Sequence, residues 1–87
     1  MTAAFPHGAS TMAQAVREHD WALTPLGPPT QWPAPLRSAV NLILSSPESM
    51  YLVWGEALTF FYNDAYTPIL GPRQRRALGA PLRALWA

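Results

Sequence analysis

The stretch LTFFYNDAYTPILG, Leu58–Gly71, carries the strongest indication of the fold. It begins with an apolar and aromatic run that is typical of a strand. The run stops at Asn63-Asp64, and a short apolar segment then ends at Gly71. We expect the Asn63 side chain to cap a short helix and Asp64 to lie in its first turn. Pro68 follows the cap closely and should limit this helix to one distorted turn.

The residues before this stretch predict its partner strand. MYLVWG, Met50–Gly55, is a short apolar run rich in aromatic and β-branched residues, and it indicates a strand buried on both faces. Gly55, Glu56 and Ala57 separate it from the next apolar run. So short a connection predicts a β-hairpin.

Residues 10–47 predict helical pieces separated by a proline-rich strap. Ser10 begins the first helix, in which Thr11 and Gln14 match a capping-box pattern. Between Asp20 and Pro33, the prolines forbid a continuous helix, because proline lacks an N–H and restricts the residue before it.

The strap nevertheless contains large apolar side chains, so we expect it to be ordered and its indoles to pack on the rest of the chain. These residues are Trp21, Leu23, Leu26 and Trp32. A second helix begins near Pro35 and ends at Pro47. Its apolar residues recur at helical spacing and are Leu36, Ala39, Val40, Ile43 and Leu44.

Motifs in this order resemble the amino-terminal region of bacterial PAS-containing sensor histidine kinases, including hybrid kinases. They are D-W-x-x-T-P-L-G-P from Asp20, W-P-x-x-L-R-x-A-V from Trp32 and Y-N-D-A-Y-x-P-I-L-G from Tyr62. The likeness covers about Met12 to Trp86. It implies an α+β, PAS-like but incomplete fold, with N-terminal helices followed by a β-hairpin and short helices.

The resemblance divides the chain into three parts. Residues 1–9 are expected to be a disordered tail, residues 10–47 a helical and proline-rich cap segment, and residues 48–87 the first half of a PAS-like domain. A complete PAS domain is a five-stranded antiparallel sheet with helices across one face, which cup a ligand cavity. Its further long helix and three further strands would lie beyond residue 87.

In a PAS sheet the first strand lies between the second and the last. Met50–Trp54 should therefore present an unpaired backbone edge in this chain, and such an edge invites another chain. We expect self-association, or pairing of this edge with a kinase-core partner, or partial disorder.

The function that the resemblance implies is signal input to a two-component system. A kinase core would receive the signal and phosphorylate a histidine with ATP. The chain has no glycine-rich phosphate loop or other catalytic motif, so we expect it not to be an enzyme itself. The alternative is a non-sensory interaction or dimerisation module that uses the exposed hairpin edge.

The aromatic residues of the hairpin allow two interpretations. In the first interpretation they form the wall of a small-molecule pocket, since such pockets are mostly apolar. The residues of this wall would be Tyr51, Trp54, Phe60, Tyr62 and Tyr66. The same side chains, together with Phe61, fill an ordinary core whether or not a ligand exists, and we prefer this interpretation. For Asn63 and Asp64 we likewise prefer a helix cap to a ligand contact, and no cofactor is indicated.

Composition limits the other function classes. A chain of 87 residues forms one small domain, and a net charge of +1 does not indicate a nucleic-acid partner. Arg73, Arg75 and Arg76 should be a solvated cluster. The absence of cysteine excludes disulfides and thiolate metal sites, and we expect His7 and His19 at the surface rather than on a metal.

No segment resembles a secretory signal or a membrane-spanning helix, which needs roughly 20 apolar residues. We therefore expect a cytoplasmic chain without a membrane partner.

Overall fold

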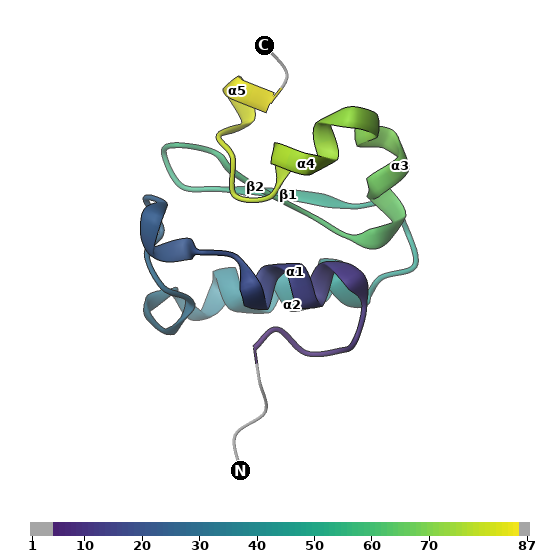
Figure 1. The fold of residues 1–87 in the computed structure, drawn as a ribbon. Coiled ribbons are helices and arrows are strands. Elements are labelled where there is room, and N and C mark those ends of the chain that lie inside the picture. The colour runs from purple at the N-terminus through teal and green to yellow at the C-terminus, as the bar shows by residue number, and fades with distance from the viewer. Residues whose placement is uncertain (1–4, 86–87) are drawn as a thin grey trace.

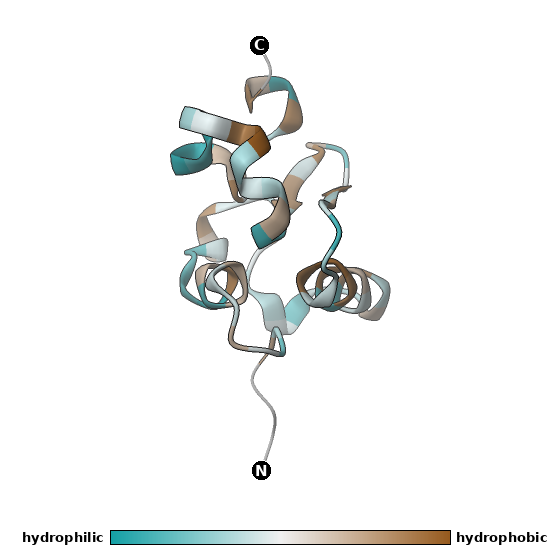
Figure 2. Cartoon of the chain, turned by 90° about the vertical axis from the view of Figure 1, so that its right-hand side faces the viewer, coloured by the Kyte–Doolittle hydropathy of each residue, from teal (hydrophilic) through white to brown (hydrophobic). Residues whose placement is uncertain are grey.

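The computed structural model describes residues 5–85, which form an α+β fold with a β-hairpin between two helical layers (Figure 1). The predicted α+β class is confirmed. The layer below the hairpin contains α1 (Thr11–Glu18) and α2 (Ala34–Ser45), which lie side by side and are seen nearly end-on in Figure 2. The layer above contains α3 (Thr67–Leu70), α4 (Gln74–Ala77) and α5 (Leu82–Leu85).

Short 3-10 turns complete the described structure. They are η1 (Trp21–Leu23), η2 (Pro29–Gln31), η3 (Asp64–Tyr66) and η4 (Gly71–Arg73). The helix predicted after Asn63 is thus divided into η3 and a single α-helical turn, as the position of Pro68 predicted. Every helix in residues 5–85 is too short or too polar to cross a lipid bilayer.

The predicted hairpin is confirmed. β1 (Tyr51–Trp54) pairs antiparallel with β2 (Thr59–Tyr62), with Val53 opposite Phe60. Leu58 belongs to the turn rather than to the strand. It adopts a φ of 52°, and its N–H donates to the carbonyl of Gly55 at 3.0 Å.

The two strands differ in burial, which corrects the prediction for the first one. All four residues of β2 are buried, whereas Tyr51 is 53% exposed and the rest of β1 is half-buried. The apolar run Met50–Trp54 predicted burial on both faces. The buried position belongs to β2, because β2 has a neighbour on each side and β1 has only one.

The second neighbour of β2 is a segment that the sequence did not predict to pair. The N–H of Phe60 donates to the carbonyl of Ala80 at 2.9 Å, and the N–H of Gly79 donates to the carbonyl of Phe60 at 2.8 Å. The N–H of Leu82 donates to the carbonyl of Leu58 at 2.9 Å. Residues 79–82 therefore cover the outer edge of β2.

Helices cover both faces of the hairpin, whereas the resemblance implied helices across one face. The two faces carry different apolar residues, because side chains alternate along a strand. Phe61 faces α1 and α2 through its contacts with Trp21 and Trp32, while Phe60 faces the opposite layer. An apolar face needs a packed layer against it, so each face has one.

The strap packs as predicted. The Trp21 ring stacks on Phe61 with centroids 5.1 Å apart, and Trp32 meets the same ring edge-on at 5.6 Å. Both indoles are buried, and their N–H groups donate to backbone carbonyls at 2.8 and 2.9 Å. Leu23, by contrast, is 84% exposed.

Helix α2 confirms the apolar periodicity predicted for this segment. Leu36, Val40, Ile43 and Leu44 are its buried residues. The described part of the N-terminal tail packs beside this layer, where the sequence predicted a disordered tail to residue 9. Pro6 is fully buried, and the Phe5 ring meets Trp32 at 5.6 Å. Residues 1–4 and 86–87 lie outside the described residues.

Candidate functional site

Asn63 lies at the corner where β2 ends, and its side chain is fully buried. Its Oδ1 accepts from the N–H of Tyr66 at 3.1 Å, which confirms the predicted N-cap. The same oxygen accepts from the N–H of Met50 at 3.1 Å. Its Nδ2 donates to the backbone carbonyls of Ile43, Ser46 and Glu48, at 2.8, 3.4 and 2.7 Å.

One amide thus joins the last turn of α2, the loop after it, the start of β1 and the start of η3. Asparagine suits this position because its side chain offers both donors and an acceptor. An aspartate in its place would keep the cap but lose the donors. We call this arrangement the Asn63 corner.

Asp64 has a partner far away in the sequence. Its carboxylate accepts from the N–H groups of Thr11 and Met12, at 3.2 and 2.7 Å. The hydroxyl of Ser10 accepts from Ala13 at 3.0 Å, so Ser10 is the N-cap of α1 and the predicted capping box on Thr11 is wrong. A negative charge at a helix N-terminus is favourable, so Asp64 ties α1 to the Asn63 corner.

The predicted aromatic set divides between the two faces of the hairpin. Tyr51, Phe60, Tyr62 and Tyr66 gather on the face toward α3 and α4, with neighbouring ring centroids 5.5 to 6.4 Å apart. Trp54 lies on the other face, because it alternates with Val53 and pairs with Thr59.

The four gathered rings run from the buried centre of the sheet to its surface. Phe60 is fully buried and Tyr62 nearly so, whereas Tyr51 is 53% exposed beside β1. The hydroxyl of Tyr62 donates to the carbonyl of Gln74 at 3.3 Å. These rings contact one another and complete the packing between the hairpin and the C-terminal helices.

The outer edge of β1 is free in the described part of the chain. Phe60 uses both of its backbone groups on residues 79–80, and Phe60 lies opposite Val53. Backbone groups in an antiparallel ladder point to alternate sides, so the N–H and C=O of Val53 point away from β2. The same holds for Tyr51, two residues earlier. Within residues 5–85, neither residue has a backbone partner on that side.

The sequence of β1 does nothing to protect this edge. Proteins usually blunt an exposed edge strand with a charged side chain, a proline or a bulge. β1 reads Tyr-Leu-Val-Trp and pairs in regular register with β2. An unprotected edge beside an exposed tyrosine is suited to receive another strand.

The histidines and arginines occupy different settings. His7 is exposed as predicted, but His19 is half-buried and its ring lies 4.4 Å from that of Trp21. Arg75 and Arg76 are exposed as predicted, whereas Arg73, the third member of the predicted solvated cluster, is half-buried. Among the described residues, no three His, Asp or Glu side chains gather where they could hold a metal ion.

No protein-family model, curated protein or solved structure matches the chain. Its contacts are therefore the basis for the functional proposal.

Proposed function

We propose that this chain is the opening part of a PAS-type sensory module, which gives signal input to a two-component histidine kinase in the bacterial cytoplasm. In this proposal β1 receives the strand that completes the sheet. The chain contributes no catalytic group, and phosphorylation belongs to a kinase core.

The free edge of β1 is the observation that carries the proposal. In a PAS sheet, the first strand lies between the second and the last. As far as the structure describes the chain, the hairpin can be extended at β1 and not at β2, because residues 79–82 already cover the outer edge of β2. The available edge is thus the one onto which the last PAS strand would pair.

The Asn63 corner offers a route by which a change at β1 reaches the helices. Its Oδ1 holds the N–H of Met50, which directly precedes β1, and its Nδ2 holds the last turn of α2. Asp64, the next residue, holds the first turn of α1. A strand or ligand that favours one packing of β1 would shift these helices with it.

The size and activity of the native protein test this proposal. An antibody against the chain should detect, in cells that produce it, a protein long enough to include a kinase core. Replacing Asn63 with alanine in that protein should alter its autophosphorylation, while the exposed-turn variant Glu56→Gln should not. A native protein of 9.6 kDa, the mass of this chain, would overturn the proposal.

The exposed Tyr51 favours a second candidate, the non-sensory dimerisation module. Two copies would pair β1 with β1 in antiparallel register, and each would cover the tyrosine of the other. Sedimentation velocity over rising protein concentration should then show a dimer that Val53→Pro dissociates. A chain that stays monomeric throughout would exclude this candidate and leave the sensory proposal standing.

A further inference from the structure

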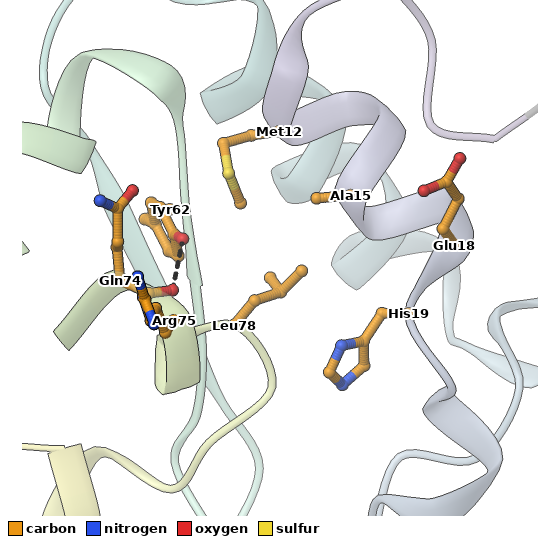
Figure 3. Close-up of a pocket in the computed structure, with 8 residues that line it drawn as sticks. All are labelled: Met12, Ala15, Glu18, His19, Tyr62, Gln74, Arg75 and Leu78. Carbon is orange, nitrogen blue, oxygen red and sulfur yellow. Dashed lines mark hydrogen bonds between the residues drawn. The ribbon is translucent and has the colours of Figure 1, made fainter. Parts of the chain in front are cut away.

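A cleft of about 340 Å³ lies between α1 and α4, away from the free edge of β1 (Figure 3). One wall comes from α1 and its C-cap, at positions that share a helix face: Met12, Ala15, Glu18 and His19. The other comes from the end of β2 and from α4 with the residue that follows it: Tyr62, Gln74, Arg75 and Leu78.

The interior of the cleft is suited to an apolar body. Met12 and Tyr62 are buried residues in its two walls, and Ala15 and Leu78 are half-buried. The small side chain of Ala15 leaves room between the walls. The volume lies at the low end of the range for small-molecule pockets, roughly 300–1,000 Å³, so a small occupant fits.

The charges around the cleft favour a single negative charge on that occupant. The guanidinium of Arg75 has no hydrogen bond or ion pair to a side chain or carbonyl of residues 5–85. The opposite wall carries Glu18, whose carboxylate accepts from Gln14 at 3.0 Å. Glu18 repels any anion at its own wall, so a ligand with one carboxylate held at the Arg75 wall fits these charges better than a dianion that reaches both walls.

Two further polar side chains, His19 and Tyr62, line the cleft, and the Tyr62 hydroxyl donates to the carbonyl of Gln74. Burial lowers the pKa of His19, which Asp20 partly opposes, so the imidazole is neutral at pH 7 and can share a hydrogen bond. Burial, together with the Asp64 carboxylate, raises the pKa of Tyr62, so its phenol keeps its proton. Shifted groups gathered in one concave site are typical of binding sites.

We propose that this cleft binds a small monocarboxylic acid with an aromatic or aliphatic body, whose carboxylate pairs with Arg75 and whose body lies between Ala15 and Leu78. A larger cleft of about 410 Å³ beside Asn41 and Leu44 has no Asp, Glu, Lys or Arg in its lining and gives no comparable indication of ligand class. The inference does not depend on the PAS proposal.

Such an occupant would join two parts of the chain that are distant in sequence. The backbone N–H of Met12 donates to the Asp64 carboxylate at 2.7 Å, and its side chain lines the cleft. A ligand between α1 and α4 therefore adds a second connection between the N-terminal and C-terminal layers.

Amide chemical-shift titration by NMR tests the proposal with phenylacetate and hexanoate, each paired with its neutral amide. We expect saturable shifts at Ala15, His19 and Arg75, with a Kd of about 1 mM for molecules of this size. Each neutral amide should bind at least about tenfold more weakly, because it lacks the charge-assisted pair.

Variants locate the binding. Arg75→Gln should weaken phenylacetate binding about tenfold or more, while Arg83→Gln, the same change on α5, should leave it unaltered. Ala15→Leu should block binding and lower the melting temperature only slightly, because Ala15 is half-buried at the cleft and leucine is nearly as good a helix former as alanine. The proposal is overturned if neither carboxylate gives saturable shifts, if acid and amide bind equally, or if Arg75→Gln and Arg83→Gln behave alike.

Discussion

The two outer edges of the hairpin differ in their backbone hydrogen bonds and in burial. At the outer edge of β2, the backbone groups of Phe60 are bonded to Gly79 and Ala80, and every β2 residue is buried. At the outer edge of β1, Val53 directs the same backbone groups outward, and Tyr51 is 53% exposed. The strands have the same length and similar apolar composition, so composition does not cause the difference.

The difference comes from what the rest of the chain supplies. Gly79 has a φ of 80°, and a Cβ there would lie 2.6 Å from Nε2 of His19. Glycine can therefore turn the chain back along β2 in contact with His19. Within residues 5–85, no segment runs along β1 in this way. One edge is closed by the chain itself, and the other is open to a further strand.

The largest loss of stability should follow from removing the Asn63 side chain, which connects the end of β2 to the start of β1. Asn63→Ala removes the cap of η3 and leaves the carbonyls of Ile43 and Glu48 and the N–H of Met50 without these bonds. Buried unsatisfied groups cost about 1–3 kcal/mol each, so we expect a loss of about 3 kcal/mol or more. Urea unfolding followed by circular dichroism measures it.

Asn63→Asp separates the cap from the donors, since it retains the acceptor oxygen only. It should be destabilising to a similar degree, because it also buries a charge. A variant that unfolds at the same urea concentration as the parent would show that the corner contributes little.

Opening the closed edge should have the next largest effect. Gly79→Ala places a methyl group against His19 in a left-handed backbone conformation, and we expect a loss of about 2 kcal/mol. Gly55→Ala is the matched control. Its φ is 79°, but nothing lies within 4 Å of the added methyl group, so about 1 kcal/mol of backbone strain alone should appear. Equal losses in urea unfolding would contradict the contact with His19.

Acid should weaken the closed edge through the same histidine. Burial lowers the pKa of His19 below its ordinary value of 6.5, so the unfolded chain binds the proton more readily than the folded chain does. Its contribution to stability is complete above pH 6.5 and is lost as the pH falls from there through the folded-state pKa. His19→Gln should flatten this slope in urea unfolding between about pH 7.5 and 5.5. Identical slopes in the parent and in His19→Gln would exclude this role.

The smallest effect should follow from changing the open edge. Val53→Pro removes an N–H that has no partner in the hairpin, so the monomer should lose about 1 kcal/mol or less. Leu52→Pro removes an N–H that the alternating ladder directs toward β2, and about 3 kcal/mol should be lost. If the two prolines are equally damaging in thermal unfolding of the monomer, the edge assignment is wrong.

Local signals in the sequence were sufficient for much of this fold. The apolar spacing of Leu36, Val40 and Ile43 predicted α2, and Asn63 at the end of an aromatic run predicted the cap. The division of the aromatic set could also have been read, because strict alternation places Trp54 opposite to Tyr51.

The remaining features depend on contacts between residues distant in sequence. The bond from Met12 to Asp64 joins residues 52 positions apart, and no local pattern indicates it. The pairing of Gly79 and Ala80 with Phe60 likewise determines which strand is buried. The cleft at Arg75 forms only because α1 and α4 meet beside Tyr62.

Amide hydrogen exchange, measured by NMR on dilute monomer, compares the two edges directly. Val53 and Phe60 lie opposite each other, and both N–H groups point outward from the hairpin, one to solvent and one to the carbonyl of Ala80. We expect the Phe60 amide to exchange on the order of 100-fold more slowly than the Val53 amide. A Phe60 amide that exchanges as fast as the Val53 amide would contradict a hairpin with one closed edge and one open edge.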